Sequence, residues 1–335
     1  MIARAAAIVL GIAAGCAALA QPADVAPDIQ AVLATHLRFS KGDLDDLRRG
    51  RIVKHGLPSR APGEIAVAGG VRILAPKAAF FARVRDIARF KSGPNVLQIG
   101  RFSSPPALDD LAALTLDEDD FDARSCRVGD CDIRMPAAAI ERFAEIDYKS
   151  SGASVRATAL FKQILFDTAA AYVSGGRPTQ YDDGPKPIRP NDEFDGILGG
   201  MPEIGELMRA LPDHLRHFPS SRLPDAEDFL YWSKEKFGIA PFVTVTHVTI
   251  VCPVPAICLM ATRDVYSSRY LDASVALAIA ADAGPDAFDL VYDNRSRANA
   301  LKGAFGGLRR SLTERRARGG LEESLKAVKM QLEKG

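Results

Sequence analysis

Four runs of strand-forming residues near the C-terminus constrain the fold of this 335-residue chain more than any other feature. They are rich in β-branched and aromatic side chains and span residues 242–251, 256–266, 270–281 and 288–295. A helical pattern over residues 308–334 follows the last run, and its leucines and valines recur on one face. The pattern predicts an antiparallel meander followed by a long amphipathic helix.

The region before residue 100 predicts at least one strand and one helix. We expect a strand over residues 64–74, with Gly69 and Gly70 forming a turn or bulge within it. Directly after Pro76 the apolar spacing changes to that of a helix, which is expected to end near Lys91.

Residues of about 150–237 have the composition and spacing of a helical insertion. Apolar residues recur at helical spacing until Gly175, and shorter helical patterns follow, the last of them over residues 225–237. We therefore expect a leader with one short helix over residues 21–60, and one α+β domain over residues 61–335 that contains the insertion.

The N-terminus has the features of a secretory signal peptide over residues 1–20. A single charge at Arg4 precedes a short apolar run that ends in small residues before Gln21. The mature protein is therefore expected in the periplasm or outside the cell. The alternative is a lipoprotein anchored through Cys16, because the residues before it resemble a bacterial lipobox.

Removal of this segment leaves four of the five cysteines, for which an oxidising compartment favours disulfides. Three pairings are open, and the wholly local one joins Cys126 to Cys131 and Cys252 to Cys258. A four-thiolate metal site is the alternative, but structural zinc sites favour closely matched pairs of cysteines. We predict the two local disulfides.

The charge balance and the motifs exclude several functional classes. The 43 basic and 42 acidic residues nearly cancel, so no nucleic-acid partner is expected. A nucleophile elbow, a zinc-protease helix and a phosphate-binding loop are all missing from the sequence. His214 and His217 lie three residues apart on an expected helix, but the sequence supplies no persuasive third ligand. We therefore expect no metal and no cofactor.

Two sets of segments carry a resemblance to known families. Residues 73–86, in which Ala-Pro precedes a helix that ends at Asp, and residues 241–332 resemble the START-like, helix-grip lipid-binding superfamily. Residues 231–234, 266–272 and 292–297 look like exported bacterial proteins of unassigned activity. The first resemblance implies an α+β fold whose curved antiparallel sheet grips the C-terminal helix around a tunnel for a lipid, sterol or polyketide.

Polar and aromatic residues on the expected strands are the candidates for ligand contact. His247 lies among valines on one strand face, where it would either fix a polar ligand group or act as a hydrogen-bonded core residue. Arginines near strand ends suit an acidic lipid head, although they equally suit surface ion pairs. The candidates are His247, Tyr266, Arg269, Tyr270, Asp272, Tyr292, Asn294, Arg295 and Trp232.

These patterns favour an exported protein that binds or carries a hydrophobic ligand without catalysis. One alternative is an enzyme of the same shape, a cyclase or lyase, that uses His247 with Tyr266, Tyr270 or Asp272 as acid and base. Another is an envelope protein-interaction module that uses the helical insertion and the basic C-terminal helix. The arginines of that helix would contact anionic lipid head groups or the acidic face of a partner, or they form an ordinary solvated face; they are Arg309, Arg310, Arg315, Arg316 and Arg318.

Overall fold

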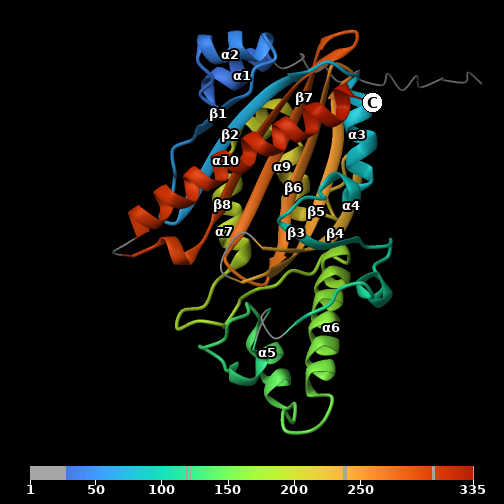
Figure 1. Ribbon diagram of the computed structural model, residues 1–335, viewed down its shortest axis with the longest axis vertical. Coiled ribbons are helices and arrows are strands. Elements are labelled where there is room, and N and C mark those ends of the chain that lie inside the picture. Colours follow the sequence, from blue (N-terminus) through green and yellow to red (C-terminus); the bar gives the residue numbers. More distant parts are fainter. Residues whose placement is uncertain (1–27, 118–119, 121, 237–239, 304–305, 335) are drawn as a thin grey trace, which may run out of the picture.

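The computed structural model describes residues 28–117, 120, 122–236, 240–303 and 306–334, and the expected signal peptide lies outside them. In this part of the chain an antiparallel sheet of eight strands forms the framework, in the order β1-β2-β8-β7-β6-β5-β4-β3. Figure 1 shows that the sheet is curved and does not close on itself. Its strands are β1 (Val53–Gly56), β2 (Glu64–Ile73), β3 (Val96–Arg101), β4 (Glu227–Glu235), β5 (Phe242–Val254), β6 (Ile257–Ser267), β7 (Ala273–Gly284) and β8 (Ala287–Arg297).

Helices cover both faces of the sheet. The long C-terminal helix α10 packs on one face together with α3 and α4, while α1, α2, α7, α8 and α9 bury their apolar residues on the other. Helices α5 and α6 extend beyond one end of the sheet (Figure 1). The bounds are α1 (Ile29–Thr35), α2 (Lys41–Arg48), α3 (Lys77–Arg85), α4 (Ile87–Phe90), α5 (Ala137–Ala144), α6 (Ala153–Val173), α7 (Pro190–Leu198), α8 (Pro202–Leu207), α9 (Leu211–His217) and α10 (Gly306–Glu333).

The strand meander and the long helix confirm the predicted fold class. Strands β5 to β8 pair with their sequence neighbours, and α10 follows them after one short 3-10 helix over Asn299–Leu301. The residues of α10 that meet the sheet are among the predicted apolar stripe, including Leu321, Leu325 and Leu332. The protein is therefore an α+β protein with an open sheet, an architecture compatible with a helix-grip fold.

The helix predicted over residues 225–237 is wrong, because Glu227–Glu235 forms strand β4. Phe229 and Tyr231 pack into the core beside α10, whereas Leu230 and Trp232 pack into the core beside α6. This alternation between faces has a period of two residues and fits a strand that is buried on both sides. Pairing with β3 and β5 decides the structure of this segment.

The turn or bulge predicted at Gly69 and Gly70 is also wrong. Both residues continue the register of β2, and Gly69 lies opposite Lys54 of β1 and Tyr292 of β8. A Cβ atom on Gly69 would lie 2.6 Å from the carbonyl oxygen of Val53 and 3.0 Å from a methyl group of Leu321 in α10. The glycine therefore lets β1 and α10 approach the strand closely.

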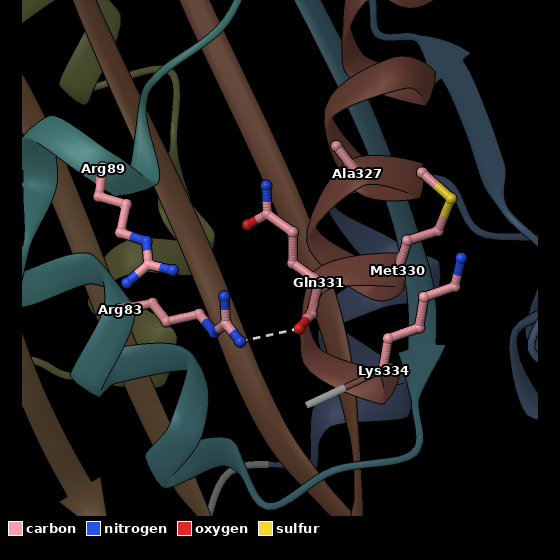
Figure 2. A pocket seen from close by; sticks show the side chains of 6 residues that line it. All are labelled: Arg83, Arg89, Ala327, Met330, Gln331 and Lys334. Atoms are coloured by element: carbon pink, nitrogen blue, oxygen red, sulfur yellow. Dashed lines mark hydrogen bonds between the residues drawn. The ribbon is translucent and has the colours of Figure 1, made fainter.

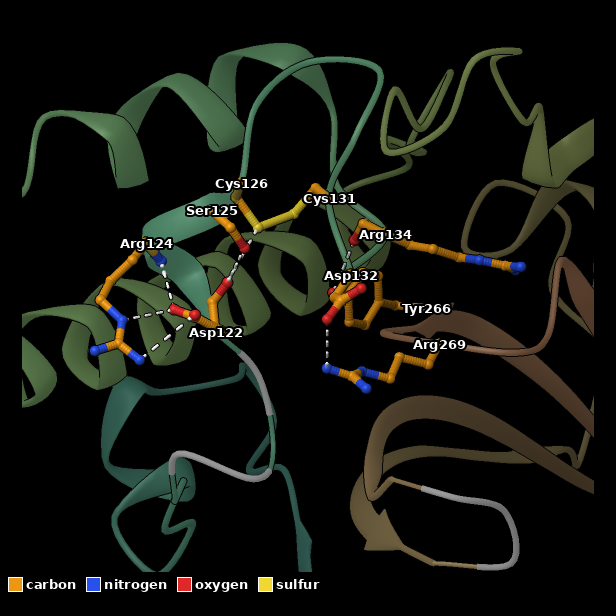
Figure 3. The surroundings of a disulfide bond; sticks show 9 residues. All are labelled: Asp122, Arg124, Ser125, Cys126, Cys131, Asp132, Arg134, Tyr266 and Arg269. Carbon is orange, nitrogen blue, oxygen red and sulfur yellow. Dashed lines mark hydrogen bonds and ion pairs between the residues drawn. A yellow bond between two sulfur atoms is a disulfide. The ribbon is translucent and has the colours of Figure 1, made fainter.

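Two disulfides confirm the local cysteine pairing. One joins Cys126 to Cys131, and the other joins Cys252 to Cys258 across the turn between β5 and β6. Figure 3 shows that the first closes a short turn near the end of the sheet. Both bonds are consistent with an oxidising extracellular location.

Among the described residues, no helix combines the length and the apolar character needed to cross a membrane.

Candidate functional site

The sheet separates the predicted ligand-binding residues onto different faces. Tyr292 packs beside α10, whereas His247 and Tyr266 lie on the opposite face. The Tyr266 hydroxyl donates a hydrogen bond to the carbonyl oxygen of Arg134 at 2.9 Å, and its ring meets Tyr181 edge to face. These aromatic residues therefore do not converge on one ligand.

The residues of the turn between β6 and β7 are occupied by structural contacts. Asp272 is buried and forms an ion pair with Arg134 at 2.7 Å. The side chains of Arg269 and Asp132 point toward each other (Figure 3), and their charged groups lie 3.9 Å apart. The Tyr270 hydroxyl bonds both the amide and the carbonyl group of Ala240. These contacts hold the turn in place, and they do not bring Asp272 or Tyr270 to His247.

The remaining candidates belong to the core or to the sheet surface. Arg295 is buried and faces Glu64 at 3.4 Å. Asn294 bonds serine hydroxyls on the α10 side of the sheet. Trp232 is fully buried, and its indole N–H donates to the carbonyl oxygen of Asp110 at 2.8 Å. The sequence reasoning thus identified polar residues that the fold uses in separate places.

A different set of residues surrounds His247 on the sheet face covered by α9. Helix α9 supplies His214, and the neighbouring strand β4 supplies Asp228. The Nε2 atoms of His214 and His247 each lie 2.9 Å from Oδ1 of Asp228. Both histidines are fully buried, and the side chain of Asp228 is 19% exposed. The three side chains offer ligand atoms that all lie within 4.8 Å of one another. We call them the His-Asp-His cluster.

Each member of the His-Asp-His cluster has an orienting partner outside it. His214 Nδ1 lies 2.6 Å from the carbonyl oxygen of Ser221. His247 Nδ1 lies 3.0 Å from the hydroxyl of Tyr172, and the Thr249 hydroxyl donates to Asp228 Oδ1 at 2.7 Å. Such second contacts fix the orientation of imidazole and carboxylate groups.

Burial and mutual contact shift the pKa values of the cluster in opposite directions. Burial disfavours charge on His214, but its hydrogen bonds to Asp228 and Ser221 and the attraction of the Asp228 charge together outweigh burial and raise its pKa. Burial lowers the pKa of His247 despite the same carboxylate. Burial would raise the pKa of Asp228, but hydrogen bonds from both histidines and from Thr249 outweigh burial and lower it. Asp228 is therefore a carboxylate between two histidines of different proton affinity.

The sequence reasoning missed this grouping because it paired His214 with His217. The structure places His217 on the exposed side of α9, where it bonds Asp213. The helix predicted over residues 225–237 also removed Asp228 from consideration. Had that segment been interpreted as a strand beside β5, Asp228 would have fallen opposite Thr249 and next to His247.

Two hollows in the described residues lie away from this cluster. The larger, of about 390 Å³, is an open groove between α3, α4 and the C-terminal end of α10. It is lined by Arg83, Arg89, Ala327, Met330, Gln331 and Lys334 (Figure 2). The smaller one, beside Lys234 and Phe242, holds only about 10 Å³.

No family model, curated protein or solved structure matches this chain. The class of protein therefore has to be inferred from the fold and the candidate sites.

Proposed function

We propose that this chain is an exported, START-like protein that binds a hydrophobic ligand with an anionic head and does not turn it over. The observation that carries this proposal is the groove between α3, α4 and α10. Three of its six lining residues are cationic, and none of the six is acidic. The ligand class is a fatty acid or an anionic phospholipid, which combines a negative head with an apolar chain.

The charges around this groove support an anionic head. Arg83 donates to the carbonyl oxygen of Gln331 at 2.8 Å, which holds its guanidinium at the groove (Figure 2). Within the described chain, Arg89 and Lys334 have no carboxylate side chain at ion-pair distance. Arginine binds carboxylate and phosphate groups with two parallel hydrogen bonds, so Arg83 and Arg89 suit such a head.

Exposed apolar atoms beside these charges support an apolar tail. Met330 lines the groove and is 44% exposed, and the methyl group of Ala327 lies in the same lining. The interior between α10 and the sheet is filled by buried side chains, among them Phe80, Phe288 and Leu325. We therefore place the ligand in the open groove and not in a closed tunnel.

Export is part of this proposal and rests on the signal peptide predicted over residues 1–20. The two disulfides support it because they need an oxidising compartment. Mass spectrometry of the mature chain tests it: an N-terminus at Gln21 is expected, whereas a lipidated Cys16 would mean a membrane anchor.

Vesicle binding tests the ligand. We expect the purified mature protein to bind vesicles that contain phosphatidylglycerol more tightly than vesicles of phosphatidylcholine alone. A basic residue near an anionic lipid surface contributes about 1 kcal/mol. The double variant Arg83→Ala, Arg89→Ala should therefore lose roughly 2 kcal/mol, or about 30-fold in affinity.

The matched control changes two exposed arginines at the other end of the same helix, Arg309→Ala and Arg310→Ala. This control should bind like the wild type. Equal binding by the Arg83 and Arg89 variant and the wild type would refute the groove. A loss confined to the control would instead assign membrane contact to the Arg-rich part of α10.

A further inference from the structure

We propose that His214, Asp228 and His247 bind a divalent transition-metal ion, with zinc as the expected occupant. This site lies on the α9 side of the sheet, whereas the groove between α3, α4 and α10 lies on the α10 side. The inference is therefore independent of the proposed ligand, and each has its own experiment.

The hydrogen bonds of His214 require a positive charge at the cluster. Its Nδ1 atom faces the carbonyl oxygen of Ser221, which only accepts, so Nδ1 carries the proton. In a neutral imidazole the other nitrogen, Nε2, then presents a lone pair. That lone pair faces a carboxylate oxygen of Asp228 at 2.9 Å. A cation has to lie between the two atoms, and it is either a second proton on His214 or a metal ion.

The surroundings of the cluster match those of protein metal sites. Histidine ligands characteristically donate the N–H of their second ring nitrogen to a carboxylate, a backbone carbonyl or a water, which orients the ring toward the metal. Ser221 takes this role for His214, and the Tyr172 hydroxyl is placed to take it for His247. Thr249 fixes the carboxylate of Asp228 in the same way. Three ligands with three orienting partners form a built site.

The donor set favours zinc over magnesium or calcium. Two imidazole nitrogens and one carboxylate oxygen suit zinc and similar ions, whereas magnesium and calcium need mostly oxygen ligands. Ligand atoms around tetrahedral zinc lie about 3.3 Å apart, as follows from metal–nitrogen distances of about 2.0 Å. The two separations of 2.9 Å from Asp228 have to open slightly to reach this value. The two histidine ligand atoms lie within 4.8 Å of each other, so a metal ion would also draw them together where they exceed it.

One member of the cluster reaches the protein surface. Asp228 is its exposed member, with 19% of its side chain accessible, while both histidines are buried. The hydroxyl of Thr249 lies 3.4 Å from His214 Nε2, but it already donates to Asp228. A water that enters beside Asp228 would therefore complete a tetrahedral shell.

Titration of the untagged, chelator-treated protein with zinc chloride tests the proposal. We expect one zinc ion per chain by calorimetry and by elemental analysis, and no comparable binding of magnesium. Cobalt should bind in its place and develop the visible absorption of a tetrahedral site. The nearly isosteric variant Asp228→Asn should lose at least 100-fold in zinc affinity, and Tyr172→Phe roughly 10-fold.

The matched control is His217→Ala, which removes an exposed histidine from the same helix and should bind zinc like the wild type. Circular dichroism in the presence of chelator establishes that each variant is folded. If Asp228→Asn does not fold, the zinc affinity of Tyr172→Phe and the cobalt spectrum of the wild type test the proposal in its place. Zinc binding that Asp228→Asn leaves unchanged overturns the proposal, and so does a wild-type protein that binds none and holds only a proton between His214 and Asp228.

Discussion

The contact between α10 and β2 makes a sharp prediction for Gly69. A methyl group there would lie 2.6 Å from the Val53 carbonyl oxygen, and contacts below 3.0 Å are essentially never found for a Cβ atom. Strand β1 has to move by about 0.4 Å, while the Leu321 and Leu325 methyl groups, at 3.0 and 3.3 Å, also have to yield. Overpacking of this kind costs about 1–3 kcal/mol.

We expect Gly69→Ala to lower the free energy of unfolding by roughly 2 kcal/mol, which raises the unfolded-to-folded ratio about 30-fold. Urea unfolding measures this through the fluorescence of Trp232, which is fully buried in the folded protein. Hydrogen exchange should also accelerate in α10, because Leu321 and Leu325 lose their close contact with the strand.

Two control variants separate this packing effect from the general effect of replacing glycine. At Gly70 a Cβ would meet its nearest neighbours at 3.1 Å, so Gly70→Ala should cost less than Gly69→Ala. At Gly42 in α2 the nearest neighbour is the Ser40 hydroxyl at 3.6 Å, so Gly42→Ala should be neutral or stabilising by up to about 1 kcal/mol. An unfolding midpoint for Gly69→Ala equal to or above that of the wild type would refute the reasoning.

Two further predictions concern stability. Burial raises the pKa of Asp264 to about 6 despite the opposing charge of Lys91. The folded protein therefore holds the proton of Asp264 more tightly than the unfolded chain does. The stabilisation from this proton is complete below the unfolded-state pKa of 3.8 and is lost as the pH rises through 6. Asp264→Asn keeps an acceptor for Thr246 and should be more stable than the wild type at pH 8 by up to about 3 kcal/mol, but not at pH 3.5. Urea unfolding of both proteins at the two pH values measures this. A stability difference between variant and wild type that is the same at both pH values would contradict the prediction. Replacing Cys252 and Cys258 by serine should lower the unfolding free energy by about 2 kcal/mol while circular dichroism of the sheet is unchanged, and a reductant that leaves the wild-type unfolding curve unaltered would speak against it.

Local patterns were sufficient to predict most of the fold. The four C-terminal strands and α10 follow from β-branched runs and from a repeating apolar stripe, and both signals arise within a few neighbouring residues. The local disulfides were predicted equally well, because only a few residues separate each pair of cysteines. Each of these features is decided by contacts that are close in sequence.

The wrong predictions concern segments whose structure depends on contacts with residues that are distant in the sequence. The apolar residues of β4 pack into two different cores, one on each face of the sheet. Their spacing in the sequence therefore does not show the alternation of a half-buried strand, and only the pairing with β5 identifies the segment as a strand. Gly69 in β2 resembles a turn residue until α10, which lies far away in the sequence, is placed against it. Neither outcome leaves a distinctive mark in the nearby sequence.

The candidate sites show the same division. The sequence by itself identified His247 as an inward residue on a strand and His214 as a helical residue, since each assignment needs only the local period. Only the tertiary structure brought them to Asp228 and joined Arg83 and Arg89 to the end of α10, because these residues lie on separate elements. The physical reason is that periodicity determines which face of an element is buried, whereas the packing of whole elements determines which buried and exposed side chains meet.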